Sequence, residues 1–164
     1  MSVIKTQFEL VSNVPEIPVE FRSIDDKYKK AFTLFDTGAS MTAISKDIVM
    51  SIDHIIIKEQ STEVSGFGGK KQADYAILAD LVIGGEHLGP VTTLVAEFSD
   101  DTRYDVILGM NIIKNFNIDM AYNSDFVNNG IITLYPRFDT LELNEQSIEN
   151  YDHKESRFGI WDIL

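Results

Sequence analysis

The hydrophobic positions of this chain fall into short runs that alternate with turn-forming residues, a pattern that predicts β-strands. The runs are continuously apolar or alternate with polar residues, and Asn, Asp, Gly and Pro stand between them. We expect strands at residues 8–11, 17–23, 30–35, 42–45, 63–65, 71–83, 91–98, 105–108, 117–122 and 130–135. The chain is therefore predicted to belong to the all-β class.

One short helix and one tight turn interrupt the first part of this pattern. Ser, Lys and Asp in succession are typical of a helix N-terminus, and they predict a short helix over residues 45–51. Gly84 and Gly85 predict a tight turn that joins the apolar residues 81–83 to the strand at 91–98.

An acidic turn follows the strand at residues 30–35. Asp36 places a carboxylate where the strand breaks, and Gly38 removes the Cβ that would block a sharp backbone path or a close ligand. Thr37 and Ser40 add hydroxyl groups that can bond nearby backbone or a neighbouring carboxylate. Asp and Gly also dominate ordinary turns for local reasons, so a plain turn explains the tripeptide as well.

Two glycine-containing motifs follow the acidic turn along the chain. Residues 65–70, with the sequence Ser-Gly-Phe-Gly-Gly-Lys, are a glycine-dense turn between two expected strands. Further on, the apolar strand at 105–108 ends in Gly109 and leads directly into a short helix, expected over residues 110–116.

An acidic turn, a glycine-tipped hairpin and Ile107-Leu108-Gly109 before a helix, in this order, resemble the retropepsin-like aspartic proteases, the single-domain relatives of the pepsins. The resemblance covers residues 8–135. It implies a closed β barrel of six to eight strands, with one short helix after the Ile-Leu-Gly motif. It also implies an aspartic endopeptidase whose active site lies at the interface of a homodimer.

By this resemblance, Asp36 is the catalytic residue and its neighbours support it. Thr37 would form a hydrogen bond across the dimer axis and hold the two acidic turns together. Gly38 would let substrate backbone pass close to Asp36. Ala39 and Ser40 fit the family pattern, although Ser40 is a smaller polar residue where many viral members carry a second acid.

The two glycine motifs have supporting roles in the same resemblance. A mobile flap that closes over bound peptide and excludes water would have its tip at Gly66, Phe67, Gly68 and Gly69. A plain hairpin turn explains these glycines nearly as well, and Phe67 is equally an apolar flap contact or an ordinary hairpin aromatic. Gly109 would sit behind the acidic turn, where a side chain would push Asp36 out of place.

Peptide hydrolysis by this class needs two aspartates that share one proton. The ionised one activates a water molecule, and the protonated one hydrogen-bonds the scissile carbonyl oxygen. Asp139 and Thr140 begin a second Asp-Thr pair, but Leu141 stands where the glycine is needed and no second lobe follows. The remaining way to assemble the pair is twofold symmetry, with Asp36 of one chain facing Asp36 of another. A homodimer is therefore expected.

Composition narrows the setting. A chain of 164 residues that is 44% hydrophobic suits one compact domain. A net charge of −12 with scattered Lys and Arg argues against nucleic-acid or anionic-membrane partners. The chain has no cysteine for a disulfide framework, no apolar run that could span a bilayer and no signal-peptide pattern. We therefore expect a cytoplasmic protein.

Competing chemistries lack their motifs. His54, His87 and His153 are dispersed without a His-Glu-x-x-His motif, and each is expected at the surface. No Gly-x-Ser-x-Gly elbow occurs, and the glycine cluster lacks the Gly-Lys-Ser/Thr ending of a phosphate loop. We expect no metal and no cofactor, and the expected partners are a peptide or protein substrate and a second copy of the chain.

The chain is divided into a retropepsin-like domain, residues 1–135, and a C-terminal extension, residues 136–164. The extension ends in an apolar cluster that is expected to pack on the domain or on the dimer interface, formed by Phe158, Ile160, Trp161, Ile163 and Leu164. A substrate-like segment that occupies or leaves the cleft is the alternative for this tail. For the domain, the alternative to a protease is a non-catalytic peptide-binding or dimerisation module on the same fold.

Overall fold

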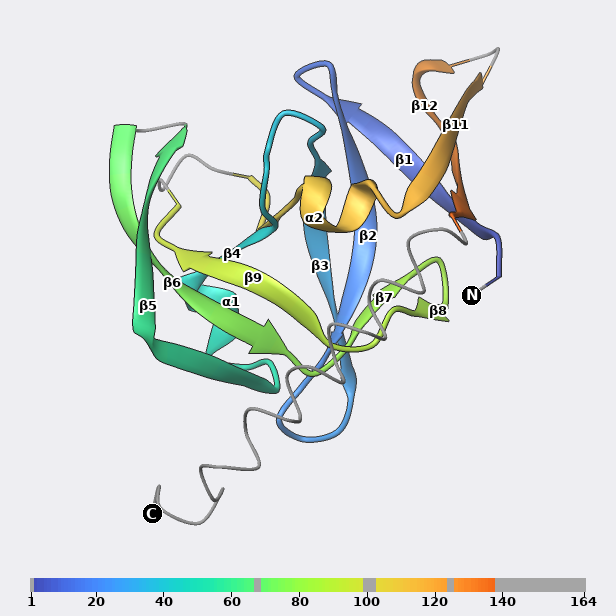
Figure 1. Ribbon diagram of the computed structural model, residues 1–164. Coiled ribbons are helices and arrows are strands. Elements are labelled where there is room, and N and C mark those ends of the chain that lie inside the picture. The colour runs from blue at the N-terminus through green and yellow to red at the C-terminus, as the bar shows by residue number, and fades with distance from the viewer. Residues whose placement is uncertain (1, 67–68, 99–102, 124–125, 138–164) are drawn as a thin grey trace.

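The structure, a computed structural model, describes residues 2–66, 69–98, 103–123 and 126–137 (Figure 1). The described residues are mostly β, as predicted. The strands are β1 (Ile4–Val11), β2 (Val14–Arg22), β3 (Tyr28–Phe35), β4 (Ala43–Ser45), β5 (His54–Gly66), β6 (Gly69–Leu78), β7 (Leu81–Ile83), β8 (Glu86–His87), β9 (Val91–Ala96), β10 (Val106–Leu108), β11 (Phe116–Asn123) and β12 (Phe126–Pro136). The predicted packing of the C-terminal tail lies outside the described residues.

The strands pair in the order β11-β12-β1-β2-β3-β10-β4-β9-β6-β5, with β7 paired to β2 and β8 paired to β7. Among the described residues, the two end strands β11 and β5 are not paired with each other, so the closure of a barrel stays a prediction. Figure 1 shows the β5–β6 hairpin and the β11–β12 hairpin on opposite sides of the molecule. The core strands β2, β3 and β10 lie between them.

The described part of the chain forms a sheet of 12 strands, more than the predicted six to eight. One reason is a break in the strand that was expected to run over residues 71–83. β6 ends at Leu78, because both of its partner strands end opposite this residue, β5 at His54 and β9 at Val91. The chain then pairs again as β7, against β2.

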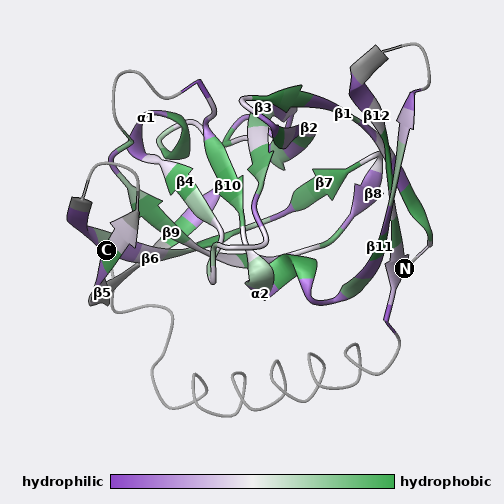
Figure 2. Ribbon diagram, turned by 90° about the horizontal axis from the view of Figure 1, so that it is seen from above, coloured by the Kyte–Doolittle hydropathy of each residue, from purple (hydrophilic) through white to green (hydrophobic). Residues whose placement is uncertain are grey.

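The alternation that predicts strands is visible in the burial of β1. Ile4, Thr6 and Phe8 are buried, and the residues between them are exposed. This period of two is what a strand with one face on the core requires. The main core gathers such faces from most strands, and among its fully buried side chains are Ile17, Phe21, Ile44, Leu108 and Ile132. In Figure 2, β7 and β10 are drawn mainly in the green of hydrophobic residues.

The turn at Gly84 and Gly85 forms, but it does not lead directly to the strand at 91–98 as predicted. Both glycines have positive φ, 57° and 85°, the conformation that two-residue hairpins favour. The strand they reach is the short β8, which pairs with β7. β9 follows only after β8, and it pairs with β6 and β4 instead.

Two short helices are present, α1 (Lys46–Val49), as predicted over residues 45–51, and α2 (Met110–Ile113), as predicted after the Ile-Leu-Gly motif. Ser45 caps α1, since its hydroxyl accepts the N–H of Ile48 at 3.4 Å. α2 is shorter than the predicted 110–116, because Phe116 already pairs with Pro136 at the start of β11. Neither helix of the described chain has the length and apolar content to cross a membrane.

Candidate active site

Asp36 follows the last residue of β3, and backbone hydrogen bonds fix the turn that it begins. Its N–H donates to the carbonyl of Leu108 in β10 at 3.1 Å, and its own carbonyl accepts the N–H of Ala39 at 3.3 Å. Its carboxylate oxygen Oδ1 accepts the N–H of Gly38 at 2.8 Å. Asp36 is half-buried, so the backbone of its own turn orients a carboxylate that solvent still reaches.

The residues after Asp36 lie at the surface of the single chain. Thr37, Gly38 and Ser40 are exposed, and Ala39 is half-buried. A Cβ at Gly38 would lie 3.1 Å from Oδ1 of Asp36, closer than most such contacts. Glycine at this position therefore leaves room for the carboxylate itself, besides the room for substrate that the sequence predicts. The exposed Thr37 lies where a second copy can reach it.

Two elements distant in sequence support the acidic turn from behind. β10 runs parallel to β3, with Leu108 opposite Phe35, and antiparallel to β4 on its other side. The first N–H groups of α2 then bond the carbonyls of the turn. The N–H of Met110 donates to Ala39 at 2.8 Å, and that of Asn111 donates to Ser40 at 3.1 Å. Figure 1 shows α2 beside the connection between β3 and β4.

Gly109 stands at the closest approach between these elements. A Cβ there would lie 2.5 Å from the carbonyl oxygen of Met41 and 2.7 Å from the nitrogen of Thr42. Both atoms belong to backbone that follows the acidic turn. Gly109 thus lies where a side chain would displace this backbone, and its role in supporting Asp36 stays a prediction.

Thr42 and Asn111 form a hydrogen-bonded link that the sequence analysis missed. Oδ1 of Asn111 accepts the N–H of Thr42 at 2.7 Å and its hydroxyl at 2.8 Å. The hydroxyl oxygen of Thr42 in turn accepts the N–H of Gly109 at 3.1 Å. The amide of Asn111 also donates to the carbonyl of Thr92 at 2.9 Å. This link binds the acidic turn, the Ile-Leu-Gly motif and β9 together.

A second apolar cluster, smaller than the main core, joins the segment after the acidic turn to the β5–β6 hairpin. Its buried residues are small or aliphatic, and partly buried residues pack against them. The buried members are Ala73, Leu94 and Ala96, and the partly buried ones include Met41, Val64, Tyr75 and Phe98. Partly buried apolar side chains of this kind are suited to contact a peptide.

Tyr104 is a further residue near Asp36 that the sequence did not single out. Its ring packs edge to face on Phe98, with centroids 5.9 Å apart. Burial raises the pKa of the Tyr104 hydroxyl, and the negative charge of Asp36 raises it further. Tyr104 therefore lies within electrostatic reach of the candidate catalytic carboxylate.

The predicted flap hairpin exists as β5 and β6. The two strands pair up to Gly66 and Gly69, and an ion pair of 2.7 Å between Lys70 and Glu63 joins them next to these glycines. Of the predicted tip, Gly66 to Gly69, the two central residues Phe67 and Gly68 lie outside the described residues. The hairpin is thus confirmed, and its action as a flap stays a prediction.

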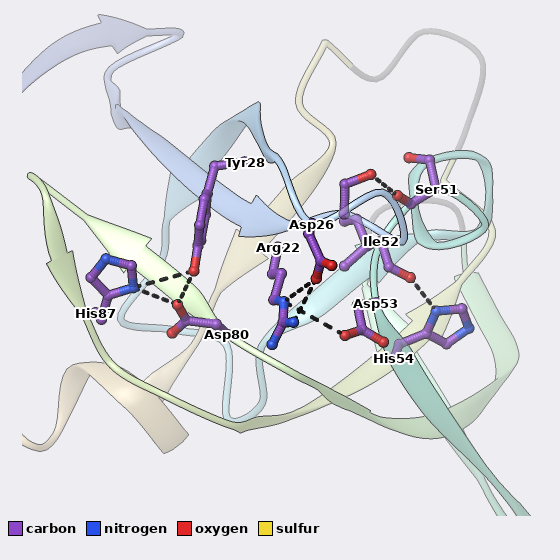
Figure 3. Close-up of polar contacts among 10 residues, drawn as sticks. Arg22, Asp26, Tyr28, Ser51, Ile52, Asp53, His54, Asp80 and His87 are labelled. Carbon is purple, nitrogen blue, oxygen red and sulfur yellow. Dashed lines mark hydrogen bonds and ion pairs between the residues drawn. The ribbon is translucent and has the colours of Figure 1, made fainter.

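The opposite end of β3 from Asp36 carries a polar cluster, shown in Figure 3. The hydroxyl of Tyr28 donates to Oδ2 of Asp80 at 2.9 Å, and Nδ1 of His87 lies 2.5 Å from the same oxygen. Burial alone would raise the pKa of Asp80, but hydrogen bonds from His87, Tyr28 and the N–H of Gly89 outweigh burial and lower it. The cluster joins β3 to the β7–β8 hairpin.

In the described part of the chain, His54 and His87 belong to no group that could hold a metal ion. His87 is exposed, as predicted, whereas His54 is half-buried with Nδ1 2.6 Å from the carbonyl of Ile52 (Figure 3). His153 lies outside the described residues. Within the described part of the chain, no group of three or more His, Cys, Asp or Glu side chains is placed to hold a metal ion.

A family model described as "gag-polyprotein putative aspartyl protease" matches residues 23–115, more than half of the chain. The match includes Asp36 and its turn, the β5–β6 hairpin, and Gly109 with α2. The chain belongs to this retropepsin-like aspartyl protease family, which confirms the resemblance seen in the sequence. No curated protein sequence matches the chain.

Proposed function

We propose that the protein is an aspartic endopeptidase that works as a homodimer, with one Asp36 from each copy in the catalytic pair. The observation that carries the proposal is the fixed position of Asp36, whose turn is bonded to β10 and α2 and whose carboxylate is oriented by Gly38. Membership of an aspartyl protease family supports the reaction class. Among the described residues the carboxylate hydrogen-bonds only its own turn, so its second oxygen is left to take part in a catalytic pair.

The requirement for a second copy follows from the chemistry. Within the described residues, the carboxylate of Asp36 forms no hydrogen bond to another carboxyl group. A shared-proton pair needs two carboxyl groups close enough that only one of them ionises. A twofold axis beside the exposed Thr37 would supply the second one, because each chain would bring the same turn to the other.

In this dimer, the ionised Asp36 would take a proton from water as the water oxygen attacks the peptide carbonyl carbon. The protonated Asp36 of the other copy would hydrogen-bond the carbonyl oxygen, on which negative charge develops. Collapse of the tetrahedral intermediate would then break the C–N bond as a carboxyl proton passes to the leaving amine. The partly buried apolar cluster of Met41, Val64, Tyr75 and Phe98 supports the proposal, because it offers contacts for substrate side chains.

The test compares the wild-type chain with Asp36→Asn on a diverse peptide mixture at about pH 5, with cleavage followed by mass spectrometry. Asn has the shape of Asp but cannot act as the base, so cleavage should disappear while folding is retained. Asp47→Asn, at an exposed acid on α1, is the control and should cut like the wild type. Cleavage by Asp36→Asn would refute the assignment, and a wild-type protein that binds peptides without cutting them would favour a non-catalytic module.

A further inference from the structure

A groove of about 570 Å³ opens beside β3. Its walls come from β1, β2, β3 and the β11–β12 hairpin, together with Arg103. Several apolar side chains on these walls are well exposed: Phe32 is 62% exposed, Tyr122 54% and Ile131 46%. Exposed apolar side chains gathered around one hollow are typical of a binding site, whereas single scattered ones are not.

Glu16, on β2, brings a buried carboxylate into this groove. The residue is only 6% exposed, and among the described residues its Oε2 has no hydrogen-bond partner. A buried carboxylate without a partner is unfavourable, because it has lost its hydration and gained nothing in return. A ligand that supplies a positive charge and N–H donors would restore what the carboxylate lacks.

The charged groups that face Glu16 leave this groove acidic. Burial raises the pKa of Glu16, Arg103 opposes this effect, and Glu9 and Asp105 reinforce it. Two acids therefore act on Glu16 against one Arg, and the ion pairs of the described part of the chain do not include one between Arg103 and Glu16. The complementary ligand is a cation on a long apolar stem, which describes the side chain of Lys or Arg.

The groove lies along the strand that leads to Asp36. Glu16 is paired with Leu34 across β2 and β3, and Pro18 is paired with Phe32. Phe32, four residues before Asp36, is about 13 Å from it along an extended strand, at roughly 3.3 Å per residue. The negative charge of Asp36 also contributes to the raised pKa of Tyr104, which follows Arg103 in the chain. An extended peptide cut at Asp36 would reach the groove about four residues from the cut.

We propose that this groove is a specificity subsite, in which Glu16 pairs with a Lys or Arg side chain of the substrate about four residues from the scissile bond. Phe32 and Pro18 would contact the apolar stem of that side chain. The subsite rests on the protease function proposed above, and it uses Glu16, whose Oε2 is the carboxylate oxygen that is buried without a partner in the described part of the chain.

The experiment uses the full chain with Asp36→Asn, so that peptides bind without being cut. The probes are blocked, fluorescein-labelled peptides with a central apolar pair and a single Lys about four residues before or after it, and their twins carry Gln instead. Fluorescence anisotropy gives the affinities. We expect the better Lys peptide to bind about tenfold more tightly than its Gln twin.

Two matched variants show whether Glu16 causes this preference. Glu16→Gln keeps the shape of the side chain and removes its charge, so the Lys-to-Gln ratio should fall to about one. Glu20→Gln removes an acid from the same strand outside the groove and should keep the ratio. Because Glu16 must be ionised to pair, the ratio in the unmodified groove should also grow from about pH 4 to about pH 7.

The outcomes separate the subsite from the protease. A ratio near one, or a ratio that Glu16→Gln leaves unchanged, overturns the subsite. A change in self-association caused by Glu16→Gln, with the peptide ratio unchanged, assigns the groove to a second copy of the chain instead. If the chain prefers Lys peptides through Glu16 but cuts no peptide when Asp36 is restored, the subsite holds and the protease function is refuted. If the restored chain cuts peptides but does not prefer Lys, the protease function holds and the subsite is refuted.

Discussion

At the scale of single residues, Gly109 keeps Asp36 in place through space rather than through backbone conformation. Its φ is −104°, which any residue can adopt. A side chain at this position would clash with backbone, because its Cβ would lie 2.5 Å from the carbonyl oxygen of Met41 and 2.7 Å from the nitrogen of Thr42. Backbone atoms do not move aside as a flexible side chain does, so the whole acidic turn would have to shift.

Gly109→Ala should therefore lower stability by about 1–3 kcal/mol and reduce kcat/KM as well. Urea unfolding and peptide cleavage are the two measurements. Gly85→Ala is the control, because its φ of 85° strains the variant although nothing lies within 4 Å of the new Cβ. The control should lose stability, but its kcat/KM, corrected for the fraction of folded protein, should stay unchanged. Unaltered cleavage by Gly109→Ala would contradict the proposed role of Gly109.

Glu16 makes the stability of the protein depend on pH. Burial raises its pKa in the folded state, so the folded chain holds the proton more tightly than the unfolded chain does. The bound proton stabilises the folded state fully below pH 4.5, the ordinary pKa of the group. This contribution to stability is lost as the pH rises through the raised pKa of the folded state. Glu16→Gln should thus be more stable than the wild type at neutral pH, with no such gain at about pH 4. Urea unfolding at both pH values measures this, and an equal or lower neutral stability would disprove it.

The local motifs Asp36-Thr37-Gly38 and Gly109 could be found in the sequence because each has an intrinsic signature, an acid in a glycine turn or a glycine after an apolar strand. Thr42 and Asn111 have none. Thr42 reads as an ordinary strand residue, and its partner lies 69 residues away. A hydrogen bond of this kind forms only when the fold brings the two segments together. No local sequence pattern can therefore predict it.

At the scale of elements, the same distinction separates what the pattern predicts from what it does not. Strands such as β2 and β3 were predicted because alternating burial leaves its period in the sequence. The break between β6 and β7 was not, because Leu78, Ala79 and Leu81 are all apolar and the strand ends where its two partner strands end, at His54 and Val91. Partner choice, rather than residue type, ends that strand.

β11 is an end strand of the sheet order, and among the described residues it pairs only with β12. Ile118 on this strand is 37% exposed. A free strand edge with apolar residues favours pairing with another chain, and lysine at such an edge opposes it. We expect a second copy of the chain to pair along β11.

Ile118→Lys should accordingly weaken the dimer by about tenfold in sedimentation measurements. Ile55→Lys is its matched control, because Ile55 is 69% exposed on β5, the strand at the other end of the sheet order. The control should leave self-association unchanged. Equal weakening by both substitutions would indicate a general effect of charge and would remove β11 from the interface.

At the scale of the whole molecule, one Asp36 per chain makes activity a property of pairs. Specific activity should fall on dilution, because dimers dissociate as the chain concentration decreases. When the wild type is mixed with an equal amount of Asp36→Asn and allowed to exchange, only about a quarter of the dimers should hold two carboxyl groups. The activity of the mixture, measured after exchange, should fall to about a quarter of the wild-type activity at the same total chain concentration. Activity that stays at half would show that single chains are sufficient.

The link between Thr42 and the segment that starts at Gly109 also has a consequence for the order in which the molecule is made. Its hydrogen bonds join residues 67 and 69 positions apart. Contacts between such distant segments form late in folding, because a long loop must close before they contribute. A nascent chain that has left the ribosome only as far as β9 already carries Asp36 but has nothing behind it. In the proposed protease, the catalytic turn is therefore supported only once β10 and α2 have been made and the loop that joins them to Thr42 has closed.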